Sequence, residues 1–357
     1  MSSVIGNNIR LSVFGESHSD GIGCVIDGLP SGIKLDFDRI KNEMKRRAPG
    51  KDKASTPRRE ADEPRIVSGV LNGVTTGAPL AVFIENTNKK SGDYENLKKI
   101  PRPSHSDYPA FIKFGGNNDV RGGGHFSARL TAPIVFAGAI AKQILEEQGI
   151  FIGAHIKRIG SVCDSSFDFN NISEDLLKKL SLKSFSVIDE SIEEEMRAEI
   201  EKYRLDGDSV GGEIECAAIG LPVGVGSNIF DTVEGKISSF IFGVPAVKGI
   251  QFGLGFDFAK KGGSEVNDGY AIKDGKVALL SNNNGGVLGG MTSGAPIVFS
   301  VAMKPTPSIA KPQKSVNLET MENEELVIKG RHDPCVAHRA VPVIEAATAL
   351  AILDLMI

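Results

Sequence analysis

Short apolar runs separated by glycines and polar turns dominate the first 85 residues of the chain. Residues 10–27 alternate apolar runs with Gly15, Gly21 and Gly23, a pattern typical of strands joined by tight turns. Residues 65–85 predict two further strands with a turn at Thr76-Gly77. The N-terminal region is therefore expected to contribute several short strands to a sheet.

Helical spacing appears first after the Gly28–Gly32 turn. Phe37, Ile40 and Met44 recur on one face, and Asp36 or Asp38 is placed to cap a helix that runs to about Arg47. The later elements predicted from the same signals are a helix over 133–148, a strand over 150–163, helices over 173–183 and 189–204, and a helix from Pro342 to about Leu355.

The second half of the chain repeats the first half in three places and in the same order. The matching pairs are Cys24–Gly32 with Cys216–Gly224, Thr75–Pro79 with Thr292–Pro296, and Arg121 before the helix at Pro133 with Arg331 before the helix at Pro342. Colinear matches indicate two related βα halves. We therefore expect a pseudo-symmetric α/β body of one domain over 1–357, with halves of about 1–160 and 205–357 joined by a helical segment, 172–204.

The composition argues against a nucleic-acid-binding, membrane, disulfide-bonded or metal-binding protein. The chain has 41 basic and 45 acidic residues, a net charge of −4, so no overall field draws it to nucleic acid or to a membrane surface. The four cysteines are scattered and the six histidines do not have metal-ligand spacing, so we expect reduced thiols and no metal site. With no signal peptide and no apolar run long enough to span a bilayer, a cytoplasmic protein is expected.

The chemistry is concentrated in residues 101–131. This segment contains His105, Asp107 and the run Arg121-Gly122-Gly123-Gly124-His125, followed by Arg129. Glycines cost backbone entropy, so three in a row indicate a close approach of the backbone to another group. Arginine forks and backbone N–H groups suit anions. The segment therefore predicts a site for an anionic small molecule, with imidazoles close enough to transfer protons.

Other positions allow two interpretations each. His18 is either a turn histidine or a general acid, and Arg46 and Arg47 either a solvated helix end or anion ligands. Asp107 is close enough to His105 in sequence to fix its tautomer. The run Lys304-Pro305-Thr306-Pro307-Ser308 is extended and carries a cation and hydroxyls that suit a phosphate.

The common nucleotide-binding and hydrolase motifs are missing from the sequence: it has no Walker A motif, no G-x-G-x-x-G unit and no G-x-S-x-G elbow.

Taken together, several segments resemble the motifs of the chorismate synthase family. The resemblance runs in order from about residue 6 to 350. The matching segments are Phe14–His18, Arg46-Arg47 with the Pro49-Gly50 turn, Arg102–Asp107, Arg121–Arg129, Val247-Lys248-Gly249, Lys304–Thr306 and Gly330–Cys335.

The resemblance implies a fold and a reaction. The family has a β-α-β sandwich body and assembles as a homotetramer. It converts 5-enolpyruvylshikimate 3-phosphate to chorismate and phosphate by a 1,4-anti elimination, and it requires reduced FMN without net redox change. The chain is thus expected to be a carbon–oxygen lyase acting on a phosphate ester in aromatic amino acid biosynthesis. NADPH remains a candidate reductant of the flavin.

The resemblance also implies roles for individual residues. His18 corresponds to the acid that protonates the reduced flavin, His105 to the imidazole near the departing phosphate, and Asp333 to the carboxylate that helps to remove the ring proton. Arg46, Arg47 and Arg129, with Arg331, would hold the substrate's anionic groups. The implied flavin contacts are His125, Phe126, Ser127, Pro245, Ala246, Gly289, Lys304, Pro305, Thr306, Pro307, Ser308 and Arg331.

The chain departs from the family pattern at four points. Ser19-Asp20 follows His18 where glycine is usual, and His125-Phe126 and Pro245 replace Arg-Ser and Asn. Lys53 stands where an arginine is common, and a lysine offers a point charge without a bidentate fork.

Two other classes of function stay open at this stage. A flavin- or nucleotide-dependent oxidoreductase could use the same glycine loops, and it would oxidise flavin in proportion to product. A non-catalytic RNA-binding module could use the basic tract at 45–59, and its binding would depend steeply on salt. The lack of aromatic residues between Phe37 and Phe83 argues against base stacking there.

Overall fold

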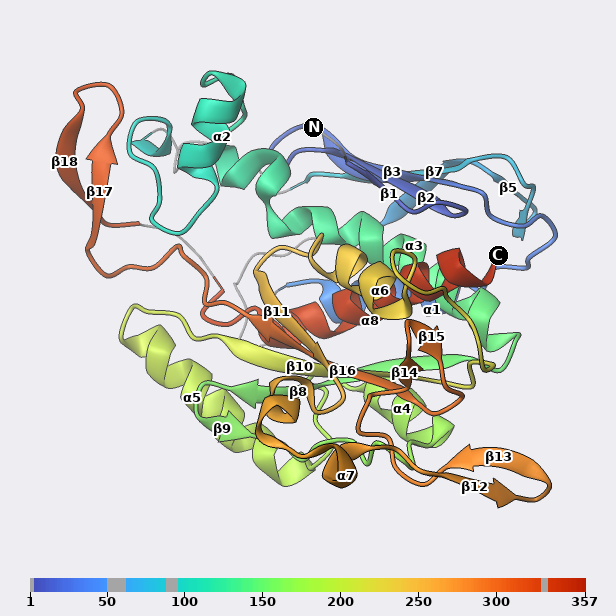
Figure 1. Cartoon of the computed structure of the whole chain (residues 1–357). Helices are drawn as coiled ribbons and strands as arrows, with labels where there is room; N and C mark the ends of the chain where they lie inside the picture. The colour runs from blue at the N-terminus through green and yellow to red at the C-terminus, as the bar shows by residue number, and fades with distance from the viewer. Residues whose placement is uncertain (1–2, 50–61, 88–95, 329–332) are drawn as a thin grey trace.

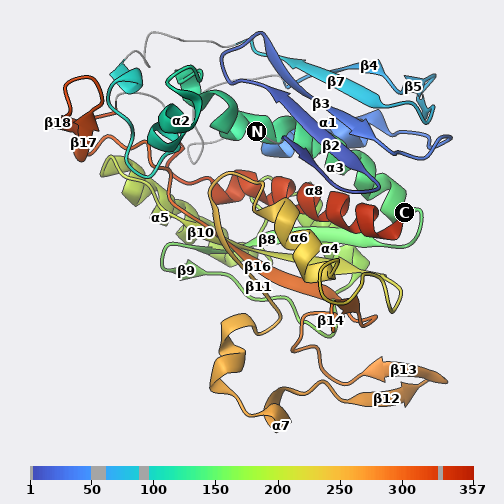
Figure 2. The same ribbon diagram turned by 45° about the horizontal axis from the view of Figure 1, so that its top comes forward.

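Two antiparallel sheets enclose a layer of helices in this computed structural model, which describes residues 3–49, 62–87, 96–328 and 333–357 (Figures 1 and 2). The first sheet has the strand order β1 (Val4–Ile5), β2 (Arg10–Gly15), β3 (Gly21–Asp27), β7 (Leu80–Glu85), β4 (Pro64–Ser68). The second has the order β11 (Val247–Phe252), β16 (Ile297–Met303), β10 (Gly212–Ile219), β8 (Phe151–Ile159), β9 (Val162–Cys163).

The two sheets are built in the same way. The order β2-β3-β7-β4 in the first matches β8-β10-β16-β11 in the second. In chain order, α1 (Phe37–Arg47) and α3 (Thr131–Glu146) of the first unit match α6 (Val233–Ile241) and α8 (Ala337–Met356) of the second. The predicted pseudo-symmetric α/β sandwich is confirmed. Strand β8, which the division at residue 160 assigned to the first half, belongs to the second sheet because it pairs with β10.

Helices α3 and α8 cross closely in the middle of the sandwich. A Cβ on Gly138 of α3 would lie 2.3 Å from the Cβ of Ala346 on α8, so only glycine permits this approach. By length and composition the helical stretch Arg121–Glu146 would suffice to cross a membrane, but 89% of its apolar window is buried inside the protein. Its main part, α3, is one of the two core helices of the sandwich, with α8.

Most predicted helices and strands are present. Helix α1 begins at Phe37, and the Asp36 carboxylate caps it by accepting from the N–H groups of Asp38 and Arg39. Helices α4 (Glu174–Leu182) and α5 (Glu193–Leu205) lie in the predicted linking segment and pack against β8 of the second sheet. Strands β5 (Val70–Leu71) and β6 (Val74–Thr75) form a short hairpin before the predicted turn at Thr76-Gly77.

Helix α8 starts earlier than predicted. It begins at Ala337 and contains Pro342, which we expected at its first turn. The extra residues are held by tertiary packing, since Ala337 and Val341 are buried and Ala337 lies against Gly212 of β10. Packing of this kind overrides the local signal of a proline.

The remaining elements are short and lie at the periphery or around the site. They are α2 (Asp107–Phe114), the 3-10 turns η2 (Arg121–Phe126), η3 (Ala128–Leu130), η4 (Glu190–Ile192) and η5 (Gly255–Lys260), α7 (Gly263–Val266), and the hairpins β12 (Tyr270–Lys273) with β13 (Lys276–Leu279), β14 (Val287–Leu288) with β15 (Met291–Thr292), and β17 (Gln313–Asn317) with β18 (Glu322–Leu326). The β12–β13 hairpin projects from the body (Figure 2).

Candidate functional site

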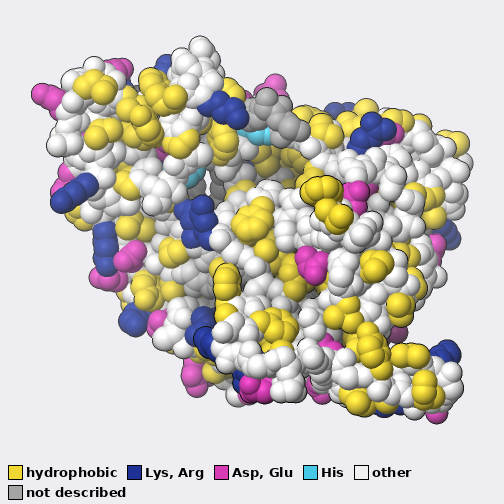
Figure 3. Space-filling view, in the orientation of Figure 1, with side chains coloured by type: hydrophobic (Ala, Val, Ile, Leu, Met, Phe, Trp, Pro, Cys, Tyr) yellow, Lys and Arg dark blue, Asp and Glu magenta, His cyan; other side chains and the backbone are white. Residues whose placement is uncertain are grey.

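A cavity of about 520 Å³ lies where segments from both halves of the chain meet. Figure 3 shows the surface hollowed below the lobe that carries α2, with basic and histidine side chains at its border. Its described lining consists of Arg47, Pro49, Arg102, Ser104–Ser106, Gly122, His125–Arg129, Phe242–Ala246, Lys304, Thr306–Ser308, Asp333, Val336 and Arg339. The volume is within the range of small-molecule sites.

His105 is held at the cavity wall by a buried carboxylate and a buried guanidinium. Its Nδ1 lies 2.6 Å from Oδ1 of Asp107 and 3.1 Å from an NH2 nitrogen of Arg102. Arg102 also donates to both Asp107 oxygens, at 2.7 and 2.8 Å, and to Ser308 Oγ at 3.3 Å. Because Nδ1–H donates a hydrogen bond to the Asp107 carboxylate, Nε2 is the ring nitrogen that can exchange a proton with a ligand.

The same contacts determine the charge of Asp107, and the surroundings of Lys304 act on its charge in a similar way. Burial tends to raise the pKa of Asp107, but the hydrogen bonds from Arg102 and His105 outweigh it and hold the pKa far below the usual value. Opposite, burial and the nearby Lys248 lower the pKa of Lys304, whose Nζ donates to the Ser104 carbonyl at 3.0 Å. Asp107 is therefore a fixed negative charge beside several donors.

The triple glycine packs between two imidazoles. Gly122, Gly123 and Gly124 all have positive φ, at 58°, 86° and 53°. A Cβ on Gly122 would lie 2.4 Å from Cε1 of His18, and one on Gly123 would lie 3.5 Å from both Cε1 and Nε2 of His105. The run is therefore required both for its backbone conformation and for this close packing.

His125 is locked by hydrogen bonds on both ring nitrogens. Nδ1 donates to the Gly15 carbonyl at 2.8 Å, and Nε2 forms a hydrogen bond of 2.8 Å with Ser3 Oγ. Beside it, Ser127 caps η3 by accepting from the Arg129 N–H, which sets the direction of the chain along the cavity wall.

Two buried arginines, Arg47 and Arg129, form a second group of positive charges at the cavity wall. Arg47 lies at the end of α1 and Arg129 in η3, and both donate to Asp62. Arg129 also donates from Nε to Asn86 Oδ1 at 2.9 Å. Burial raises the pKa of Asp62, but its attraction to Arg47 and Arg129 prevails and lowers the pKa overall.

Asp333 and Arg339 face each other at the start of α8. Arg339 pairs with the Asp333 carboxylate and donates from Nε to the Arg47 carbonyl at 3.1 Å. No local pattern in the sequence pointed to Arg339, because its partners come from other turns and from α1. Arg102, Asp62 and Arg339 were not assigned a role from sequence, although Arg102 lies inside a matching motif.

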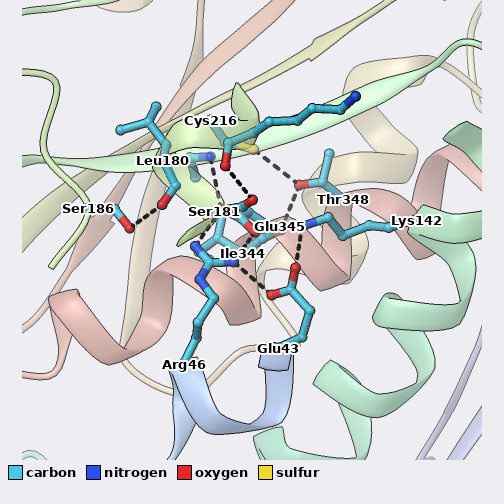
Figure 4. Close-up of polar contacts among 12 residues, drawn as sticks. Glu43, Arg46, Lys142, Leu180, Ser181, Ser186, Cys216, Ile344, Glu345 and Thr348 are labelled. Atoms are coloured by element: carbon cyan, nitrogen blue, oxygen red, sulfur yellow. Dashed lines mark hydrogen bonds and ion pairs between the residues drawn. The ribbon is translucent and has the colours of Figure 1, made fainter. Parts of the chain in front are cut away.

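Arg46 points away from the cavity, which corrects its prediction as a substrate ligand. Figure 4 shows it with Glu43 and Lys142 around Glu345 of α8. It donates to Glu345 at 2.6 and 3.0 Å and to Glu43 at 2.7 Å, while Lys142 donates to Glu345 at 2.8 Å. Burial raises the pKa of Glu345, but Arg46 and Lys142 outweigh it and lower the pKa. A buried carboxylate thus holds the Arg46 guanidinium in the core.

Three other predicted residues are not part of the lining. His18 is buried behind Gly122, Pro305 turns toward Gly211, and Gly289 lies in the β14–β15 turn. Arg331 and Lys53 lie outside the described residues. The other predicted site residues all border the cavity: Arg47, His105, His125, Phe126, Ser127, Arg129, Pro245, Ala246, Lys304, Thr306, Pro307, Ser308 and Asp333.

The donor set of the cavity suits a ligand with several negative charges. Among the described lining residues the basic side chains are Arg47, Arg102, Arg129, Lys304 and Arg339, and the acidic one is Asp333. Thr306 Oγ1 is buried with no hydrogen-bond partner in the described part of the chain. Phe126 and the Phe242–Ala246 loop add an apolar wall. These residues fit a flat ring system that carries a phosphate, next to a second anionic molecule.

Comparison with known proteins shows the family of the chain. The chorismate synthase family model matches residues 9–357. The chain is 48% identical to the chorismate synthase of Pyrococcus abyssi over 349 residues, covering 98% of this chain and 96% of that protein. It is 45% identical over 365 residues to that of Lancefieldella parvula, covering 99% and 96%. A solved structure titled "Crystal Structure of Chorismate Synthase" superposes with a TM-score of 0.77 at 29% identity, covering 99% of this chain and 92% of that one. The chain belongs to the chorismate synthase family of lyases.

Proposed function

We propose that this enzyme converts 5-enolpyruvylshikimate 3-phosphate to chorismate and phosphate by a 1,4-anti elimination that requires reduced FMN. The observation that carries the proposal is one cavity wall that joins a cationic anion-binding set to the His105–Asp107 pair and to Asp333. Family membership supports the reaction, and the site chemistry fits a substrate with a phosphate and two carboxylates.

The His105 corner suits the departing phosphate. His105, Arg102 and Lys304 bring donors to one part of the cavity, and Asp107 keeps the imidazole in one tautomer. Positioned donors of this kind stabilise charge that develops on a leaving group. The His105 imidazole is oriented to donate from Nε2 when it is protonated, or to accept there when it is neutral.

The remaining residues would hold the flavin and the ring proton. When bound, reduced FMN supplies the electron density that the elimination needs. His125, Phe126, Ser127, the Pro245-Ala246 loop and the Lys304–Ser308 segment would hold it, and Asp333 would accept the ring proton. Gly289, Pro305 and Arg331 remain proposed flavin contacts, and His18 remains the proposed proton donor, acting from behind Gly122.

Four further properties are proposed from the family and from the composition of the chain. We propose a homotetramer in the cytoplasm, with no nucleic-acid partner. NADPH is proposed as a reductant of the flavin, either on this enzyme or through a separate reductase.

Anaerobic turnover tests the proposal. With chemically reduced FMN and the substrate, we expect chorismate absorbance and phosphate to appear in equal amounts while the flavin stays reduced. Folded protein that forms no chorismate under these conditions would refute the reaction. Flavin oxidation in proportion to product would instead favour the oxidoreductase alternative.

A further inference from the structure

Arg339 connects the two halves of the chain at the cavity wall. It lies in the first turn of α8, and its NH1 nitrogen pairs with Oδ2 of Asp333. Its Nε donates to the carbonyl oxygen of Arg47, the last residue of α1, at 3.1 Å. The two contacts use different nitrogens of one rigid planar group, so the Asp333 carboxylate and the end of α1 are held in a fixed relation to each other.

The carbonyl group of Arg47 requires a donor from outside its helix. The last carbonyls of an α-helix have no partner within it, and a cation is favoured at that end. The Arg339 guanidinium supplies both the donor and the charge. Because the Arg47 side chain lines the cavity, Arg339 fixes the helix end from which this side chain reaches the site.

The backbone around Asp333 is held by contacts that do not involve Arg339. The Pro334 carbonyl accepts from the Val210 N–H at 2.8 Å, next to the start of β10, and Cys335 is fully buried. A fixed backbone still allows the carboxylate to rotate about its side-chain bonds. The ion pair with Arg339 restrains this rotation, and the two side chains are only 15% and 18% exposed.

We propose that Arg339 is a positioning residue that orients the Asp333 carboxylate for removal of the ring proton. The proposal rests on the proposed function, because the role of Asp333 belongs to it. Arg339 takes no proton itself, since a guanidinium group stays protonated in proteins. It acts through Asp333, and its hydrogen bond to Arg47 keeps that carboxylate in register with the end of α1.

The test is the Arg339→Lys variant, which keeps the positive charge but loses the planar fork. A single ammonium group cannot hold both partners in the same geometry. The kcat is expected to fall roughly tenfold to a hundredfold, the scale of a small misplacement of a reacting group. The KM is expected to change much less, because the charge of the cavity is kept.

An isotope effect separates this role from a purely structural one. With substrate that carries deuterium in place of the ring proton that is lost, the isotope effect on kcat is expected to be larger in Arg339→Lys than in the wild type. A misplaced carboxylate slows proton removal specifically, whereas a partly unfolded protein would lower the rate without changing the isotope effect. A lower kcat with an unchanged isotope effect, or a raised KM with unchanged kcat, would overturn the proposal.

Arg39→Lys is the matched control. Arg39 also lies on α1 and forms an ion pair, donating from NH2 to both Glu146 oxygens at 2.7 Å, and it is absent from the described lining of the cavity. This variant is expected to keep the wild-type kcat and isotope effect. Loss of kcat in Arg39→Lys as large as in Arg339→Lys would overturn the proposal, because any loosening of α1 would then be sufficient.

A crystal structure of Arg339→Lys gives a reading that does not depend on turnover. The Asp333 carboxylate is expected to turn away from its wild-type position, and an unchanged position would overturn the proposal. If the wild-type enzyme forms no chorismate, the proposed reaction fails, while this structure still decides whether Arg339 orients Asp333. Should Arg339→Lys fail to fold, Arg339→Gln decides: a wild-type kcat and isotope effect would overturn the proposal.

Discussion

At the residue scale, the short spacing between His105 and Asp107 in the sequence places the two side chains in a hydrogen-bonded pair at the cavity wall. Asp107 follows His105 by two residues, and the turn into α2 brings Oδ1 to 2.6 Å from Nδ1. Arg102, three residues before His105, completes the arrangement by donating to Asp107, and its NH2 nitrogen lies 3.1 Å from Nδ1 of His105. The imidazole therefore has a fixed tautomer and a fixed orientation toward the cavity.

The Asp107→Asn variant tests this arrangement. The amide keeps the shape but no longer favours the Nδ1–H tautomer, and it leaves Arg102 without its anionic partner. We expect kcat to fall by roughly 10²-fold or more, the scale of a positioned acid–base group, with a change in the pH profile of kcat.

The control for this variant is Asp268→Asn, since Asp268 binds Ser281 and Asn284 far along the chain from the cavity segments. It is expected to keep the wild-type kcat. An Asp107→Asn enzyme with unchanged kcat and pH profile would exclude Asp107 from the positioning of His105.

Sequence reasoning at this scale succeeded where partners are close along the chain. The His105–Asp107 pair was predicted from its spacing. Asp62 was not, because its partners lie 15 and 67 residues away and no local pattern connects them. Arg46 was assigned to the wrong surroundings for the same reason, since Glu345 is 299 residues distant.

At the scale of elements, local signals located helices well but their ends less well. The Asp36 cap fixed the start of α1, where the side chain itself satisfies the first N–H groups. The start of α8 was missed because contacts with the second sheet determine it. The β12–β13 and β17–β18 hairpins were also missed, since their strands are only four or five residues long.

One pairing of strands carries an ionic cluster that makes stability depend on pH. His155 on β8 lies opposite Glu215 on β10, and its Nε2 is 3.0 Å from Oε2 of that residue. Its Nδ1 is 3.0 Å from Oδ2 of Asp164, and Lys157 lies 3.1 Å from the other Glu215 oxygen. Burial lowers the pKa of His155, but the two carboxylates outweigh it and raise the pKa overall.

The protonated imidazole should therefore stabilise the fold in a defined pH window. Its contribution is fully present below the unfolded pKa of roughly 6.5, and it is lost as the pH rises through the raised folded pKa. We expect His155→Gln to cost about 3–5 kcal/mol at pH 6, because two buried carboxylates lose their partner. The difference in stability from the wild type should shrink toward alkaline pH.

Denaturant unfolding of both proteins from pH 5.5 to 9 measures this effect. A difference between His155→Gln and the wild type that is constant across this range would show that His155 does not change its protonation there. Activity per folded molecule is expected to stay near the wild-type value, since the cluster lies away from the lining of the cavity.

At the scale of the whole molecule, the duplicated architecture explains the position of the cavity. Each half places a segment before its long central helix, and α3 and α8 cross so closely that these segments converge. The cavity therefore takes residues 102–129 from one half and residues 242–246, 304–308 and 333–339 from the other. The three colinear repeats predicted the two related halves, but not which side chains face the cavity.

The most direct test of the account is a structure of the enzyme with oxidised FMN and 5-enolpyruvylshikimate 3-phosphate. We predict both molecules in this cavity, with the substrate phosphate within about 2.6–3.2 Å of Nε2 of His105 and another anionic group against Arg47 and Arg129. A substrate bound outside the cavity, or one with no anionic group near His105 or this arginine pair, would contradict the account.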